Sequence, residues 1–204
     1  MAGRTNLRAG AARKTLMKIR TTGLLLLALL FAGCWQKSVH PFYLPKDIVA
    51  EPKLVGTWTE KKDGDKMIWT FNDATNASLD LVIRTEKEKL DYIAHVFRLD
   101  GARYLDLFNA GPREISTLPV HHLFRLDEVG TTLKVTPLNI NWVQKWLAKN
   151  PGALAYISVV DPEHRDDRDS DERVLTADTK ALQSFLRTHA KDEEFLGDAV
   201  TFMR

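Results

Sequence analysis

Apolar and polar residues alternate along most of the chain between residues 54 and 136, which is the pattern of half-buried β-strands. In an extended segment Leu79, Leu81 and Ile83 would share one face. Asp80 and Arg84 would lie on the opposite face. The pattern predicts strands over the segments Leu54–Glu60, Lys66–Asn72, Leu79–Thr85, Leu90–Leu99, Arg103–Phe108, Leu123–Asp127 and Thr132–Thr136.

Short turn sequences separate these predicted strands and favour hairpins between neighbours. Asp-Gly between two alternating runs is a strong hairpin signal, and it occurs at Asp63-Gly64 and Asp100-Gly101. Glu128-Val129-Gly130 predicts a third hairpin. Consecutive hairpins make an antiparallel meander, which must curl or be covered to bury its apolar face.

Helical spacing of apolar residues begins only late in the chain. Asn139 or Asn141 can cap a first helix, which Asn150-Pro151-Gly152 would end. We expect its two tryptophans to pack on the sheet rather than to form an exposed stacking platform. The apolar stripe of this helix consists of Trp142, Val143, Trp146 and Leu147.

A second helix follows, with Asp178 or Thr176 as its cap and with Leu182, Phe185, Leu186 and His189 on one stripe. Further strands are predicted at Ala153–Val160, Arg173–Ala177 and, returning to the sheet edge, Ala199–Met203. The sequence therefore predicts an α+β fold. Its largely antiparallel meander sheet or partial barrel would carry two or more covering helices in the C-terminal half.

The first 33 residues have a different composition, with six basic side chains and no acidic ones. An apolar run of nine residues, Leu24–Ala32, follows the basic part. This is the pattern of a secretory signal peptide. The run is too short for a spanning helix, which needs about 20 apolar residues.

The end of this leader, Phe31-Ala32-Gly33-Cys34, resembles the lipobox of bacterial lipoprotein precursors. The resemblance implies that Cys34 is modified by a diacylglyceryl thioether, becomes the new N-terminus and is N-acylated with a chain such as palmitate. The family prefers leucine where this chain has Phe31. The alternative is an ordinary signal peptide cut nearby, which would leave the only cysteine as a free thiol.

On this interpretation residues 1–33 are the signal peptide, 34–53 a lipidated N-terminus and tether, and 54–204 one α+β domain. Packing of Phe42, Tyr43 and Leu44 onto the domain is the alternative to a free tether. Trp35 rather than aspartate follows Cys34, which favours the outer membrane if the cell has two. The domain would then lie outside the cytoplasm, in the cell envelope.

The basic net charge of +2 belongs to the leader. Without the six leader cations, 23 of the 29 Lys and Arg remain against 27 Asp and Glu, a net charge of −4. A basic patch is the usual footprint of nucleic-acid binding. We therefore expect no nucleic-acid partner for the mature chain.

Gly56-Thr57-Trp58, on the first predicted strand, resembles the Gly-x-Trp signature that opens lipocalin-like barrels. The resemblance implies a barrel that Trp58 closes at one end, with a cavity for a small apolar ligand. The sequence does not place the downstream arginine of that family. A core tryptophan in a barrel with a filled interior is the alternative.

The most charged stretch is Asp161–Glu172. Asp167, Asp169 and Asp171 have the spacing that opens a calcium-binding loop. The sixth position, where that loop needs glycine, is Glu172, and the twelfth, where it needs glutamate, is Asp178. We therefore favour a solvated loop.

Histidines offer the other candidate site. His121 and His122 would point to opposite faces of a strand, so we expect one to be partly buried and hydrogen-bonded and the other exposed. His95 can approach one of them across a sheet, but no ligands have zinc-like spacing. We predict no metal and no cofactor.

No nucleophile elbow or phosphate-binding loop is present, and carboxylates such as Asp91, Asp100 and Asp106 are not paired with a base by the sequence. We therefore expect a non-catalytic lipoprotein domain that contacts envelope proteins or a small apolar ligand. The alternative is an envelope hydrolase or assembly factor with its site near His95 and His121 or in the Asp161–Glu172 loop. A pocket in which a histidine meets two carboxylates would favour that alternative.

Overall fold

The computed structural model describes residues 35–62, 65–75, 77–109, 119–159 and 172–204. Trp35–Arg204 forms one compact unit. The leader with Cys34 lies outside the described residues, and so do Asp161–Asp171 of the charged stretch.

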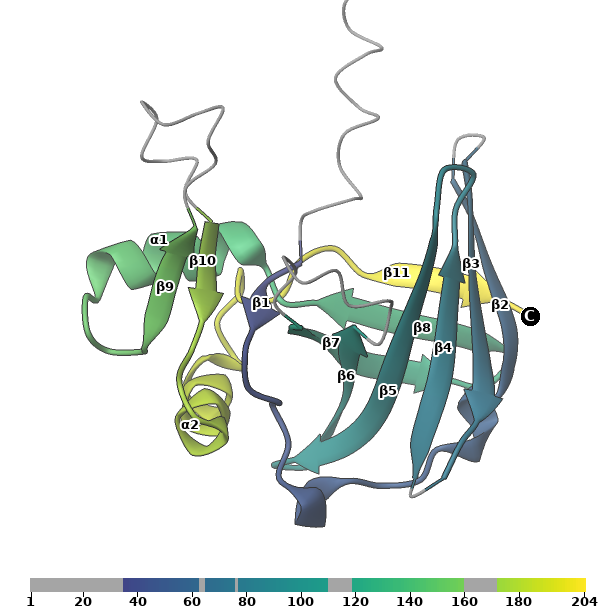
Figure 1. The fold of residues 1–204 in the computed structure, drawn as a ribbon, viewed down its shortest axis with the longest axis horizontal. Coiled ribbons are helices and arrows are strands. Elements are labelled where there is room, and N and C mark those ends of the chain that lie inside the picture. Colours follow the sequence, from purple (N-terminus) through teal and green to yellow (C-terminus); the bar gives the residue numbers. More distant parts are fainter. Residues whose placement is uncertain (1–34, 63–64, 76, 110–118, 160–171) are drawn as a thin grey trace, which may run out of the picture. The chain divides into compact units, whose positions relative to one another are not determined.

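Eight antiparallel strands form a closed barrel (Figure 1). Neighbouring strands pair in sequence order from β2 to β8, and β11 pairs with both β8 and β2 to complete the ring. The strands are β2 (Gly56–Lys62), β3 (Asp65–Asp73), β4 (Ser78–Arg84), β5 (Lys89–Leu99), β6 (Ala102–Asn109), β7 (His121–Val129), β8 (Thr132–Pro137) and β11 (Val200–Met203).

The ring corrects two expectations. The barrel is closed rather than a meander or a partial barrel, because β6 pairs with β7 and β11 bridges β8 and β2. For the same reason the C-terminal strand does not lie at a sheet edge. It is the strand that closes the barrel.

The hairpins have the predicted strand pairing. Asp100 and Gly101 both have positive φ, 48° and 85°, as the two central residues of a type I′ turn require. The predicted turn at Glu128-Val129-Gly130 begins later than expected, because β7 continues to Val129 after an irregularity between Leu126 and Glu128.

A three-stranded extension leaves the barrel at the start of β7. There β1 (Lys37–Ser38) pairs with β7 on one side and, in parallel, with β10 (Glu172–Leu175) on the other. β9 (Tyr156–Val159) forms the outer edge beyond β10. Two helices accompany this extension: α1 (Ile140–Lys149), capped by the Asn139 side chain, and α2 (Thr179–His189), capped by Asp178.

One hydrophobic core fills the barrel. Trp69 on β3 contacts Phe124 on β7 and Phe202 on β11, with ring centroids 5.7 and 4.8 Å apart, so side chains from far around the ring meet inside it. Trp58 and Phe71 belong to the same cluster, and all five are at most 1% exposed. The interior holds large aromatic side chains.

A second core joins the outer face of the barrel to the helices. Phe97 and Leu123 point outward from β5 and β7 and belong to one buried cluster with Leu147 of α1 and Leu186 of α2. The two tryptophans of α1 are half-buried and pack against this second core, which includes the sheet residues Phe97 and Leu123, as predicted. Their rings contact Phe185 and His189 of α2 and the nearby Phe195.

The segment before the barrel runs along its outside. Phe42 is completely buried, and Gln183 of α2 donates a hydrogen bond to its carbonyl at 3.1 Å. Two short 3-10 turns follow, Pro45–Asp47 and Pro52–Leu54. Between them the Val49 N–H donates to the Val96 carbonyl at 2.9 Å. Of the two alternatives for this segment, packing onto the domain is therefore the one observed.

Candidate functional site

A buried carboxylate lies where the N-terminal segment crosses the barrel. Asp106 is fully buried on β6 and faces outward, between the inward-facing Leu105 and Leu107. Its Oδ1 is 2.6 Å from Nδ1 of His121 on β7, and its Oδ2 accepts the Phe42 N–H at 3.0 Å. Both oxygens thus have partners from different parts of the chain.

His95 and Tyr43 extend this cluster. His95 is opposite Asp106 in the β5–β6 register, and its Nδ1 is 3.2 Å from the Tyr43 hydroxyl. Burial lowers the pKa of His95, although the charge of Asp106 opposes the shift. Burial and the same charge raise the pKa of Tyr43 to about 12. At neutral pH His95 is therefore neutral and Tyr43 protonated.

Ser38 adds a hydroxyl beside the histidine. It is opposite His121 in the β1–β7 register, and side chains of directly opposed residues lie on the same face of a sheet. Serine, histidine and aspartate are the residue types of a hydrolase triad. Here, however, the Ser38 hydroxyl donates to the His40 carbonyl at 2.8 Å.

The three side chains are also covered. Ser38 and Asp106 have no exposed surface, and His121 is 7% exposed. A substrate would have to displace the segment around Phe42 to reach them. In this structure the histidine–aspartate pair fastens the N-terminal segment to the barrel.

His122 is more buried than the sequence predicted. It points to the opposite face from His121, as predicted, but it is also only 7% exposed rather than solvent-facing. Both faces of β7 are covered at this point, since the barrel core lies on one and the N-terminal segment on the other. Burial, with a contribution from the Lys37 charge, lowers the pKa of His122 to about 4, so its ring is neutral at physiological pH.

A histidine that meets two carboxylates would have favoured the hydrolase alternative. Among the described residues His121 meets one, Asp106, and His95 meets the Tyr43 hydroxyl instead. No cluster of three or more metal-binding side chains occurs in the described ranges. Within those same ranges, none of the helices has the length and apolar character needed to cross a membrane.

At another place on the barrel, Trp58 is paired with an arginine. The Trp58 indole donates to the Leu54 carbonyl at 2.7 Å, and the Arg204 guanidinium lies 4.7 Å from its ring centroid. Arg204 also donates to the carbonyls of Lys53 and Val55, at 2.9 and 3.2 Å. Arg204 therefore ties β11 to the 3-10 turn that leads into β2.

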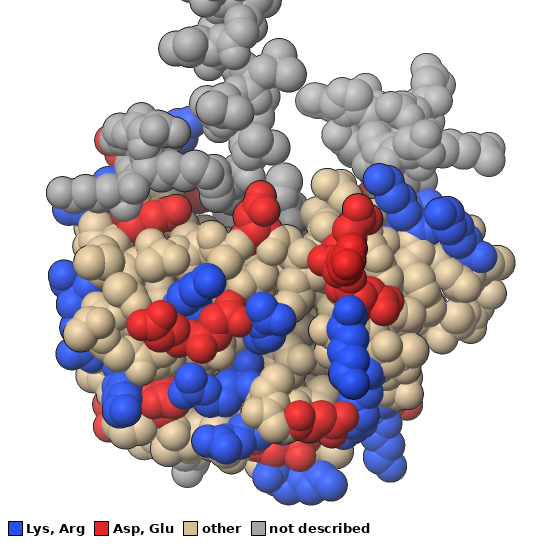
Figure 2. All heavy atoms as spheres, turned by 180° about the vertical axis from the view of Figure 1, so that it is seen from behind, with Lys and Arg blue, Asp and Glu red and all other residues tan. Residues whose placement is uncertain are grey.

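A hollow of about 370 Å³ opens at the surface beside β8 and the segment after α2. Its lining mixes signs, with Arg125 and Lys191 against Asp192 and Glu193. Arg125 is already paired with Asp127 at 2.6 Å, and Asp192 with His189 at 2.6 Å. Figure 2 likewise shows basic and acidic side chains interspersed on one face. Neither the hollow nor this face therefore favours a ligand of one charge.

Sequence reasoning singled out His95 and His121 but missed their partners. Asp106 stands in an otherwise apolar and aromatic run, Tyr104-Leu105-Asp106-Leu107-Phe108, and a charged residue in such a run is a signal for a buried, paired carboxylate. Ser38 gives no comparable signal, because it lies in an irregular stretch far from β7 in sequence.

These observations define a class of fold: a closed eight-stranded antiparallel barrel with a three-stranded extension and two helices. The closed eight-stranded antiparallel barrel is compatible with the barrels of lipocalin-like proteins. Comparisons of the chain with protein-family models, with curated proteins and with solved structures found no match.

Proposed function

We propose that this protein is a bacterial lipoprotein of the cell envelope, anchored through acyl chains on Cys34, whose barrel is a non-catalytic binding or structural domain. The basic leader, the short apolar run and the lipobox-like Phe31–Cys34 support the anchor. Two or more acyl chains give stable membrane attachment, whereas one gives only marginal binding. The domain would lie outside the cytoplasm, on the outer membrane in a cell with two.

The observation that carries the proposal of a domain acting through its surface is the filled barrel. Its interior is occupied by Trp58, Trp69, Phe71, Phe124 and Phe202, each at most 1% exposed. Such packing supports a domain that acts through its outer surface, by contact with other envelope proteins. The Trp58–Arg204 contact supports the lipocalin-like resemblance of the architecture, since that family carries a downstream arginine.

Metabolic labelling with an alkyne analogue of palmitate tests the anchor. The wild-type protein should incorporate the label and enter the detergent phase on partitioning, and the Cys34→Ala variant should do neither. A labelled variant, or a mature protein that begins at a residue other than Cys34, would refute the assignment.

Native mass spectrometry of the mature protein tests the filled interior. We expect the mass of the acylated chain alone. A stoichiometric apolar adduct that survives purification would instead assign the barrel to the ligand-binding alternative of the lipocalin-like resemblance.

A second candidate function, an envelope hydrolase, is favoured by one specific observation, the 2.6 Å contact between His121 and Asp106 with Ser38 alongside. A serine-directed fluorophosphonate probe distinguishes the two functions. The hydrolase predicts labelling of Ser38 that His121→Gln abolishes. The non-catalytic domain predicts no labelling in either protein.

A further inference from the structure

The folded unit begins directly after the proposed lipidation site. Trp35 belongs to the partly buried shell of the barrel core, where its ring centroid lies 4.8 Å from that of Phe124 and 5.6 Å from that of His122. Its backbone also bridges to Asn139, the cap of α1 that follows β8. The first described residue is therefore part of the barrel and not of a free tether.

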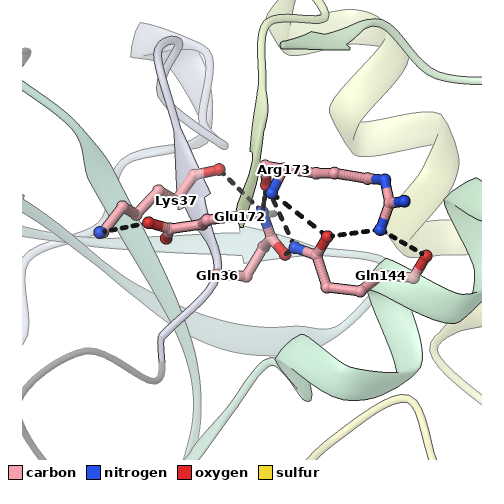
Figure 3. Close-up of polar contacts among 5 residues, drawn as sticks. All are labelled: Gln36, Lys37, Gln144, Glu172 and Arg173. Carbon is pink, nitrogen blue, oxygen red and sulfur yellow. Dashed lines mark hydrogen bonds and ion pairs between the residues drawn. The ribbon is translucent and has the colours of Figure 1, made fainter. Parts of the chain in front are cut away.

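The next two residues are fixed by the polar network in Figure 3. The Gln36 side chain, 1% exposed, donates to the Arg173 carbonyl at 2.7 Å and accepts from Gln144 of α1 at 3.1 Å. Lys37 forms an ion pair with Glu172 at 2.9 Å. These contacts tie Gln36 and Lys37 to α1 and β10, so the first residues after Trp35 are part of the folded unit.

The covalent connection between Cys34 and Trp35 limits how far the domain can lie from the bilayer. Consecutive Cα atoms are about 3.8 Å apart, so acyl chains on Cys34 would start within one residue of Trp35. A domain fixed at Trp35 has no linker with which to move away from the membrane surface. This step rests on the proposed lipidation of Cys34.

The same end of the three-stranded extension exposes apolar side chains. β1 and β10 are parallel and both start near Trp35, and β9 is antiparallel to β10 and therefore ends there. On β9, Ile157 is 46% and Val159 48% exposed. Exposed apolar side chains are favoured at the boundary between lipid and water.

We propose that this end of the extension, where Ile157 and Val159 are exposed beside Trp35, rests against the phospholipid bilayer that holds the acyl chains of Cys34. The protein is then an oriented barrel lying directly on the membrane rather than a domain on a flexible stalk. The far end of the barrel, where β11 ends, faces the aqueous compartment and remains free for partners.

Site-specific quenching tests this orientation in the acylated protein on phosphatidylcholine vesicles. Acylation blocks Cys34, so a fluorophore can be placed through Val159→Cys or, as the control, Met203→Cys. Met203 is 58% exposed and pairs with Thr132, at the end of β8 opposite to Trp35. Lipids with nitroxide headgroups should quench the Val159 label at least threefold more than the Met203 label, and equal quenching would overturn the orientation.

A linker variant tests the cause. Twenty Gly and Ser residues inserted between Cys34 and Trp35 have a root-mean-square reach of about 25 Å. They should reduce the difference in quenching between the two labels by at least half, and an unchanged difference would overturn the argument from the short connection.

Vesicle flotation and the mass of the N-terminal peptide separate this inference from the proposed function. A protein that lacks acyl chains and does not float refutes the lipidation and the orientation together. A protein that is acylated and floats but gives equal quenching refutes the orientation alone.

Discussion

Asp106 is a fully buried carboxylate with hydrogen-bond partners from two other parts of the chain. Its two oxygens satisfy His121 and the Phe42 backbone, so one carboxylate connects β6, β7 and the N-terminal segment. Nearby, His122 is buried in neutral form, and its Nδ1 has no hydrogen-bond partner within the described structure. Because both side chains are buried, removing a hydrogen-bond partner of Asp106 or protonating His122 would destabilise the folded state.

The lowered pKa of His122 predicts acid sensitivity. The unfolded chain binds a proton near pH 6.5 and the folded chain only near pH 4, so stability from this group is complete above pH 6.5 and is lost as the pH falls toward 4. Urea denaturation should show a loss of about 2 kcal/mol from this group between pH 7 and pH 5.

Two glutamine variants test this assignment, one at His122 and one at a control position. His122→Gln should remove this part of the pH dependence, whereas His40→Gln, at an exposed position, should retain it. An equal pH dependence in wild type and His122→Gln would contradict the assignment to His122.

At the scale of elements, the sequence placed most strands and both helices within a few residues. This worked where the signal is local, as in the alternation of Leu79, Leu81 and Ile83. Of the two cap candidates for α2, the structure selects Asp178, whose side chain accepts the Ala181 N–H at 2.8 Å. The sequence left a tether and packing as open alternatives for residues 35–53, because this segment has no period and its side chains pack individually against a surface formed elsewhere. Phe42 shows this, since its neighbours come from β6 and α2.

Truncation of Phe42 measures how firmly this segment is held. Phe42→Ala should destabilise the fold by about 3–5 kcal/mol, because it leaves a cavity in the second core. Lys46→Ala, at an exposed position in the same segment, should change stability by less than about 0.5 kcal/mol. Similar small effects of both variants in urea denaturation would mean that the segment is not part of the folded core.

At the scale of the whole molecule, closure of the barrel depends on its last strand. β11 brings Phe202 into the interior beside Trp69 and pairs with strands that come from much earlier in the chain. Without it β8 and β2 would both be open edges, and unpaired edges favour aggregation.

Deletion of residues 200–204 should therefore abolish the closed barrel. We expect weakened near-ultraviolet circular dichroism from the tryptophans, increased binding of an apolar dye and a tendency to aggregate. Thr201→Ala, at an exposed position on the same strand, should leave all three unchanged. A truncated protein with the wild-type spectrum and melting curve would show that β11 does not close the fold.

The sequence by itself determined the local features: the alternation of the strands, the hairpin at Asp100-Gly101 and the apolar stripes of the two helices. Each depends on residues close together in the chain, whose periodicity or backbone preference is independent of the rest. Only the tertiary structure decided which strand closes the ring, that His121 and His122 are both buried, and that Asp106 fastens the N-terminal segment. These features arise from contacts between residues far apart in sequence, and such contacts leave no local pattern.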